Sequence, residues 1–259
     1  MTQADKARAF AALHVKGAPL VLYNIWDAGS ARAVAEAGAR ALATGSASVA
    51  GAHGYPDGEA IPLDLLETVV ARIAASVDLP VSVDFEGAYA TEPAAAADNV
   101  ARLIGAGAIG INFEDQVIGG EGLHDIAAQA ARIAAVRAAA EALDVPLFIN
   151  ARTDLFLKKR TEPESHAGLM AEAKERAAAY AEAGASGFFA PVLFDEELIA
   201  ELCAATDLPV NIIMLPGAPA VKRLGELGVA RASYGPVPFR VLMAELTARA
   251  RDALGTAAG

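Results

Sequence analysis

The strongest constraint on the fold is an alternation of short apolar runs with alanine-rich segments, repeated eight times along the 259 residues. The runs have the unbroken hydrophobic character of parallel strands covered on both faces. The predicted strands are residues 20–25, 39–43, 81–85, 108–113, 147–151, 186–190, 210–214 and 229–234. Segments with helical periodicity separate them, at residues 65–76, 94–104, 125–142, 171–183 and 196–204. The pattern therefore predicts an α/β fold built from strand-helix units.

Glycine and proline mark the ends of these predicted helices. A glycine that could cap the helix in a left-handed conformation stands before several strands, at Gly38, Gly107, Gly184 and Gly228. Other helices end before an Asp-Leu-Pro or Asp-Val-Pro sequence, because proline cannot continue a helix. Eight such units of about 30 residues predict a TIM (β/α)8 barrel, with an open doubly wound sheet as the alternative. No low-complexity linker interrupts the chain, so we predict one domain over residues 1–259.

Composition narrows the classes of partner. The net charge of -11 argues against nucleic acid, which requires a basic surface. The single cysteine, Cys203, cannot form an internal disulfide and lies in an apolar helical pattern, which predicts a buried thiol. No apolar run approaches the ~20 residues that span a bilayer, and the first residues lack the layout of a signal peptide. We therefore expect a cytoplasmic protein with no membrane partner.

Two acidic clusters stand where predicted strands end. Asp84 and Glu86 lie two residues apart in a segment expected to be extended, so both side chains should point to one face. Glu114 ends the next strand, which is the neighbour in a barrel. Carboxylate oxygens are the ligands that Mg²⁺ and Mn²⁺ prefer. We predict a metal site of Asp84, Glu86 and Glu114; solvated carboxylates in turns are the alternative.

Further polar residues converge on the same expected mouth of the barrel. Arg152 could clamp a substrate carboxylate or stabilise an enolate oxygen, or form an internal salt bridge with Asp154 or Glu114, and both could hold at once. Small residues at Thr44, Gly45, Ser46 and Ala47 could offer backbone N–H groups to a substrate carboxylate. Asn150 and Asn211 also stand at strand exits. These residues are the predicted substrate-binding set.

These motifs together resemble the isocitrate lyase and phosphoenolpyruvate mutase superfamily. The resemblance runs in the same order over nearly the whole chain. It rests on residues 24–31, 44–57 and 209–211, and on Val83-Asp84-Phe85-Glu86, Ile111-Asn112-Phe113-Glu114-Asp115 and Asn150-Ala151-Arg152-Thr153-Asp154.

The resemblance implies an enzyme that uses Mg²⁺, or Mn²⁺, on a small 2-oxo or 2-hydroxy acid and works through a metal-stabilised enolate. It implies that Asp84 binds the metal directly, while Glu86, Glu114 and Asp57 hold waters of the metal. It also places the amides of Ser46 and Ala47 around the substrate and Arg152 on it, so that Arg152, Asp57 and Glu114 are the expected catalytic residues.

The resemblance further implies a homo-oligomer, a dimer or a homotetramer, in which the last helix is exchanged between subunits. The expected exchanged segment is residues 239–254.

One segment departs from the superfamily pattern. Superfamily lyases carry a cysteine motif on the loop after the fourth strand, and the mutases carry Lys and Asn there, whereas residues 116–124 read Gln-Val-Ile-Gly-Gly-Glu-Gly-Leu-His. His124 or Glu121 could replace the missing acid. Decarboxylation needs less from this loop, so an oxaloacetate-type decarboxylase and a 2-methylisocitrate-type lyase rank as near equals. The alternatives are a P–C bond hydrolase or mutase, or a catalytically silent barrel that binds a metabolite.

Overall fold

The computed structural model describes residues 1–159 and 161–255, and all eight predicted strands are present in it. Most are shorter than predicted, and β4 and β5 each end one residue later than predicted. The strands are β1 (Leu20–Leu22), β2 (Leu42–Ala43), β3 (Val81–Asp84), β4 (Gly110–Glu114), β5 (Phe148–Arg152), β6 (Gly187–Phe189), β7 (Val210–Ile213) and β8 (Arg231–Ser233).

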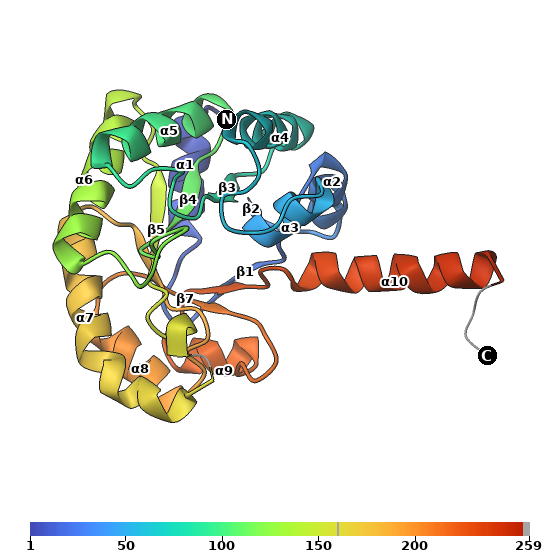
Figure 1. Ribbon diagram of the computed structural model, residues 1–259. Coiled ribbons are helices and arrows are strands. Elements are labelled where there is room, and N and C mark those ends of the chain that lie inside the picture. The colour runs from blue at the N-terminus through green and yellow to red at the C-terminus, as the bar shows by residue number, and fades with distance from the viewer. Residues whose placement is uncertain (160, 256–259) are drawn as a thin grey trace.

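The strands form one parallel sheet that nearly closes on itself. Its order is β1-β8-β7-β6-β5-β4-β3-β2. The remaining gap between β1 and β2 is spanned by a parallel bridge between Ile25 and Thr44. Ile25 N donates to Ala43 O at 2.9 Å, and Gly45 N donates to Ile25 O at 3.2 Å. The predicted TIM barrel is confirmed, and Figure 1 shows its helices arranged around the strands.

The helices of the described residues follow the strands in alternation. They are α1 (Gln3–Ala12), α2 (Ala28–Glu36), α3 (Ser46–Ala52), α4 (Leu63–Ser76), α5 (Pro93–Gly105), α6 (Ile126–Ala142), α7 (His166–Glu182), α8 (Glu196–Ala205), α9 (Val221–Glu226) and α10 (Val237–Ala253), with short 3-10 helices η1 (Leu157–Lys159) and η2 (Pro163–Ser165). The sequence analysis assigned no residue ranges to α1, α2, α3 and α9, although Gly38 and Gly228 marked the expected ends of the helices that are α2 and α9. These helices have 10, 9, 7 and 6 residues and bury few side chains, so their periodicity is weak.

The glycine that ends α5 shows how the sequence sets a helix boundary. Gly107 has a φ of 103°, in the left-handed region that the predicted cap requires. A Cβ atom added to Gly107 would also lie 2.7 Å from the Cβ of Ala74. Backbone conformation and close packing therefore both favour glycine at position 107, in the turn between α5 and β4.

Apolar side chains fill the space between strands and helices. Cys203 is 6% exposed, as predicted for a structural thiol. At the amino-terminal end of the strands, the ring of Phe10 from α1 packs edge-on against Phe148, with ring centres 5.3 Å apart. Among the described residues no helix combines the length and apolarity needed to cross a membrane.

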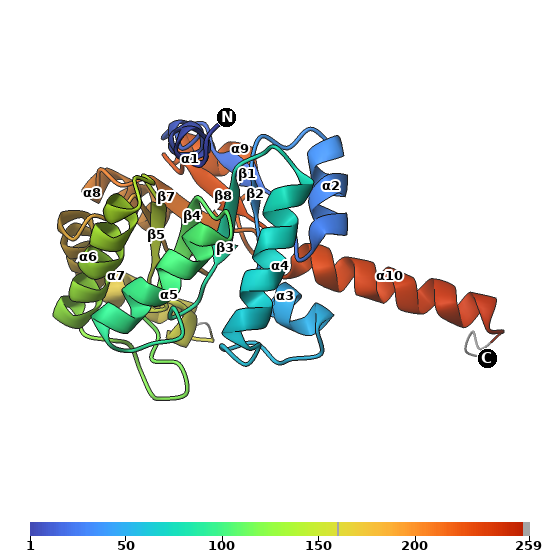
Figure 2. The same cartoon turned by 90° about the horizontal axis from the view of Figure 1, so that it is seen from above.

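Helix α10 differs from the other helices because it extends away from the barrel (Figures 1 and 2). Only Pro238 of this helix is buried. Val241, Leu242 and Leu246 are 56%, 50% and 60% exposed. The helix therefore presents apolar side chains that no other described part of this chain covers.

Candidate active site

A cavity of about 550 Å³ opens at the carboxyl ends of the strands. This is the end at which TIM barrels carry their chemistry, and the volume lies within the roughly 300–1,000 Å³ of small-molecule sites. Six of the residues predicted from the sequence line it: Gly45, Ser46, Ala47, Asp57, Asp84 and Arg152. The structure therefore brings together side chains that lie more than a hundred positions apart in the sequence.

Asp84, the last residue of β3, is held in place by three neighbours. Its Oδ2 accepts a hydrogen bond from Ser46 N at 3.0 Å, and its Oδ1 accepts one from Asn112 Nδ2 at 3.1 Å. Its own backbone N donates to Thr44 Oγ1 at 2.9 Å. The carboxylate is therefore fixed at the cavity wall. The Ser46 N–H, expected to contact substrate, is occupied by Asp84 instead.

Glu86 is close to Asp84, but the expected extended segment is wrong. The strand ends at Asp84, and Glu86 lies in a turn with a φ of 51°. Its Oε1 accepts hydrogen bonds from Gly58 N at 2.8 Å and Glu59 N at 3.0 Å. Burial, together with the charges of Asp84 and Asp57, raises the pKa of Glu86 to about 8. A polar turn, rather than strand alternation, places this carboxyl group.

Asp57 and Glu114 complete the group of carboxylates. Burial and the charge of Asp84 raise the pKa of Asp57. Glu114 is 3% exposed, and burial raises its pKa strongly; Arg152 opposes this, while the charges of Asp154, Asp84 and Glu86 add to it. The site concentrates more negative charge than its cations neutralise.

Arg152 is the cation that faces these carboxylates. Its Nη1 lies 2.8 Å from Glu114 Oε2, and its Nε and Nη2 lie 2.6 and 2.9 Å from the two oxygens of Asp154. Both predicted salt bridges are present. A guanidinium has five N–H donors, so Arg152 keeps donors for a ligand while its plane is fixed.

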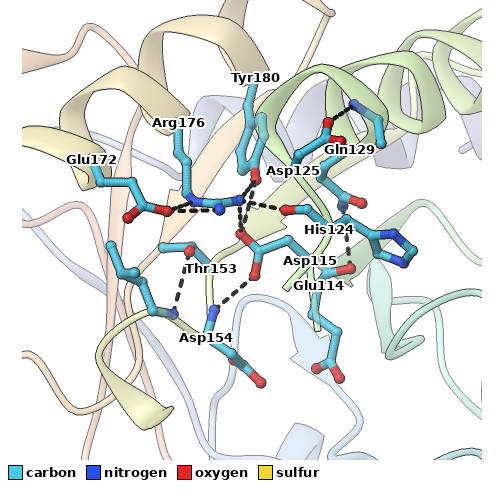
Figure 3. Close-up of polar contacts among 12 residues, drawn as sticks. Glu114, Asp115, His124, Asp125, Gln129, Thr153, Asp154, Glu172, Arg176 and Tyr180 are labelled. Carbon is cyan, nitrogen blue, oxygen red and sulfur yellow. Dashed lines mark hydrogen bonds and ion pairs between the residues drawn. The ribbon is translucent and has the colours of Figure 1, made fainter. Parts of the chain in front are cut away.

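A buried cluster around Asp115 holds the backbone of Asp154, the residue whose carboxylate pairs with Arg152 (Figure 3). Asp115 accepts hydrogen bonds from Arg176 Nη1 at 3.0 Å, Tyr180 Oη at 2.8 Å and the backbone N of Asp154 at 3.0 Å. In Figure 3 the side chains of Glu114 and Asp115 point apart, the latter toward α7. No sequence pattern indicated Arg176 and Tyr180, because they follow Asp115 by about sixty residues.

The remaining predicted substrate-binding residues lie beneath the cavity and do not line it. Thr44, Asn150 and Asn211 are 1%, 1% and 0% exposed. Asn150 Nδ2 donates to Asn112 Oδ1 at 2.9 Å and to Asn211 Oδ1 at 3.1 Å. These amides form a polar layer inside the barrel because side chains that point inward from neighbouring strands meet there. Asn112, which the sequence analysis did not select, connects this layer to Asp84.

The loop that departs from the superfamily pattern forms a short hairpin. Gln116 and Leu123 form an antiparallel bridge, and His124 N donates to Asp115 O at 2.7 Å. His124 lies beside a separate small cavity with Arg132, and Glu121 is exposed. Neither residue suggested as a replacement acid lines the main cavity in this arrangement.

The carboxylates fit a hydrated divalent cation. In the part of the chain that the structure describes, no three His, Cys, Asp or Glu side chains are placed to hold an ion directly. Mg²⁺ commonly binds through one or two carboxylates and keeps several waters. Asp84 at the cavity wall, with the carboxyl groups of Asp57 at the same cavity and of Glu86 and Glu114 nearby, whose pKa values are raised by burial and by the charge of Asp84, matches that requirement.

Comparison with known sequences decides the family. The sequence profile of the family described as phosphoenolpyruvate phosphomutase matches residues 10–254. The chain belongs to this family. The resemblance drawn from the motifs is therefore confirmed, and so is the prediction of an enzyme of the isocitrate lyase and phosphoenolpyruvate mutase superfamily.

Individual relatives differ in their named reactions. The 2-methylisocitrate lyase of Escherichia coli K12 is 30% identical over 251 residues, covering 93% of this chain and 82% of that protein. An uncharacterized protein of Mycobacterium tuberculosis H37Rv is 38% identical over 232 residues, covering 89% and 83%. The crystal structure of a provisionally assigned phosphonomutase from Burkholderia cenocepacia J2315 has 46% identity and a TM-score of 0.94, covering 97% of this chain and 100% of that one.

Proposed function

We propose that this family member is a Mg²⁺-dependent or Mn²⁺-dependent enzyme that breaks a carbon-carbon bond in a small 2-oxo or 2-hydroxy carboxylic acid, as a lyase or a decarboxylase. The observation that carries the proposal is the placement of Asp84 and Arg152 on one cavity wall, with the carboxyl groups of Asp57, Glu86 and Glu114 around Asp84. Family membership and the named 2-methylisocitrate lyase relative support the same class of reaction.

The proposed metal site uses Asp84 as the direct ligand, with Glu86 and Glu114 accepting hydrogen bonds from waters of the ion. When bound, a divalent cation supplies Lewis-acid stabilisation of negative oxygen. Asn112 and Ser46 fix the Asp84 carboxylate so that it needs no reorientation when an ion arrives.

Arg152 and Asp57 act on the organic substrate in this proposal. In a 2-oxo acid, breaking the carbon-carbon bond leaves its electron pair on the carbon beside the 2-oxo group, as an enolate, while carbon dioxide or a carbonyl compound departs. In a 2-hydroxy acid, the hydroxyl group loses its proton and its carbon becomes the carbonyl carbon of the departing 2-oxo acid, while the electron pair remains on the carbon beside the carboxylate of the other product, as the enolate. Arg152 donates to the substrate carboxylate or the enolate oxygen through N–H groups that Glu114 and Asp154 leave free. Asp57 lines the cavity with a raised pKa, so its protonated form can return a proton to the enolate carbon.

The test combines binding with turnover. Isothermal titration should show Mg²⁺ binding to the wild type, and oxalate, which mimics the enolate of pyruvate, should bind only with the metal present. Asp84→Ala should lose both. The matched control is Asp98→Ala, which removes an exposed carboxylate on α5 far from the cavity. No metal binding by the wild type would contradict the proposal.

Turnover is measured as pyruvate release from oxaloacetate, 2-methylisocitrate, 2,3-dimethylmalate and phosphonopyruvate. Release that depends on Asp84 identifies the reaction class; the oxaloacetate assay includes a control with Mg²⁺ alone. Because neither His124 nor Glu121 lines the cavity, a silent metabolite-binding barrel is the second candidate. Metal and oxalate binding without turnover of any compound would favour it.

We also propose that the protein assembles with copies of itself through α10. Its exposed Val241 and Leu242 lie beside a second cavity of about 620 Å³, whose walls include Val21, Tyr23 and Val34. Apolar patches left open on one subunit favour association. Cytoplasmic location and a single domain remain predictions from the sequence.

A further inference from the structure

The main cavity has two chemically different sides. One side holds the carboxylates and Arg152. The other side comes from the loops that follow β6 and β7 and from η1. Its side chains are all apolar: Leu157, Phe189, Pro191, Val192, Ile213 and Leu215. A ligand held by Asp84 and Arg152 would therefore extend its far end along a hydrophobic surface.

This apolar side contains no partner for a second negative charge. Among the described residues that line the cavity, the cations are Arg152 and Arg240, with no lysine or histidine. Arg152 is already bonded to Glu114 and Asp154. Arg240 stands in the first turn of α10 and is exposed. A carboxylate buried against the apolar side would lose its hydration without gaining a hydrogen bond, which is unfavourable.

Val192 shows that the apolar side is built at a cost in backbone energy. It has a φ of 60° and is 3% exposed. A β-branched residue in the left-handed region is strained, and such strain persists where the surrounding structure enforces it, often at ligand sites. Glycine or asparagine would adopt this conformation more easily, yet the chain places an apolar side chain here.

We propose that the substrate carries an uncharged alkyl or aryl tail, which lies against Val192, Leu215 and their neighbours, instead of a second carboxylate. This inference rests on the proposed function for the other end of the substrate, where a 2-oxo acid group contacts the metal site and Arg152. It selects the cleavage in which a carbonyl compound that carries the tail departs, because loss of carbon dioxide would need a second carboxylate. The volume of about 550 Å³ leaves room for such a tail beside the acid group. Hydrophobic contact then determines which 2-oxo acid is bound.

The test measures affinities in saturating Mg²⁺ for ligands that share one acid group and differ in the tail. Pyruvate, 2-oxobutanoate, 2-oxopentanoate and 2-oxohexanoate form the alkyl series, 2-oxoglutarate has a carboxylate tail, and oxalate has no tail. Burial of each methylene should tighten binding about fourfold. 2-Oxoglutarate should bind no more tightly than pyruvate.

Two variants connect the result to the apolar side. Val192→Thr keeps the shape and the branched Cβ but replaces a methyl group by a hydroxyl, and Leu215→Asn makes a similar exchange on the other loop. Each should weaken 2-oxohexanoate relative to oxalate by about fourfold or more. Agreement between two separate loops guards against a folding defect in either variant.

The outcomes separate the two proposals. Oxalate that binds with Mg²⁺, together with an alkyl series of equal affinities, would overturn the inference and leave the proposed function intact. Tighter binding of 2-oxoglutarate than of 2-oxopentanoate, lost in Arg240→Gln, would also overturn it by showing that Arg240 receives a second carboxylate. Failure of oxalate to bind at all would refute the proposed function, and this inference with it.

Discussion

Without a divalent cation, the stability of the protein should fall as the pH rises through neutrality, because of Glu86. This side chain is 6% exposed, and burial together with Asp84 and Asp57 raises its pKa from 4.5 to about 8. Between those two values the folded protein holds a proton that the unfolded chain has released. The free energy of unfolding must therefore decrease with increasing pH in that window.

The expected size follows from the number of protons involved. One proton held only by the folded state changes the free energy of unfolding by about 1.4 kcal/mol per pH unit. His14 acts in the opposite direction, since burial lowers its pKa from 6.5 to about 3. The rise in stability that His14 causes with increasing pH is mostly complete above pH 6.5. Between pH 6.5 and 7.5 Glu86 is largely protonated, so its own contribution is a loss of about 1 kcal/mol.

The assay is urea denaturation in EDTA at several pH values, with Glu86→Gln as the matched variant. Glutamine retains an oxygen that can accept from Gly58 N and Glu59 N, as Glu86 does. The difference between the two proteins cancels the contribution of His14. Saturating Mg²⁺ should stabilise the wild type more at pH 8 than at pH 6.5, because the cation favours the ionised carboxyl group.

Either of two results would refute this reasoning. Equal pH dependence of the wild type and Glu86→Gln in EDTA would show that the pKa of Glu86 is not raised. A stabilisation by Mg²⁺ that did not change with pH would show that Glu86 does not lie beside the cation.

Three further predictions concern other parts of the molecule. Asp115→Asn should reduce the free energy of unfolding by about 3 kcal/mol in urea denaturation, because it removes the buried carboxylate partner of Arg176 and leaves only the more exposed Glu172. Glu172, the more exposed carboxylate partner of Arg176, gives the control: Glu172→Gln should reduce the free energy of unfolding by less than about 1 kcal/mol. Asn112→Leu should weaken Mg²⁺ binding in isothermal titration by about tenfold or more, since Asp84 loses a supporting donor; unchanged affinity would exclude that role. Leu246→Glu should shift the molar mass in light scattering toward the monomer, whereas a mass equal to that of the wild type would show that α10 does not form the interface.

The sequence alone determined the fold because the information is local. Alternating apolar strands and alanine-rich helices have their own periods, and proline and glycine end the helices at predictable positions. The bounds of the short helices α1, α2, α3 and α9 could not be predicted because so few of their side chains are buried. Their existence depends on packing against the barrel more than on their own periodicity.

For the site, the sequence could place residues at strand ends but could not say which way each side chain turns. It identified Asp84 and Arg152, which line the cavity, because the carboxyl ends of parallel strands meet at one mouth. Asp57, which also lines the cavity, was expected only from the resemblance to the superfamily. The sequence also selected Asn150 and Asn211, which lie beneath that mouth. Depth along the strand decides between these outcomes: Asn150 and Arg152 point to the same face of β5, but Arg152 lies two residues nearer the mouth.

Only the tertiary structure showed which residues support the site and which residues line the other side of the cavity. Arg176 and Tyr180 come from α7 to hold Asp115, and the apolar side of the cavity comes from loops after β6 and β7. Neither feature has a signature in sequence, because loop conformation and contacts between distant segments are fixed by packing over the whole barrel. The sequence thus determined the fold and the reacting groups, while the tertiary structure decided how rigidly those groups are held and what lies opposite them.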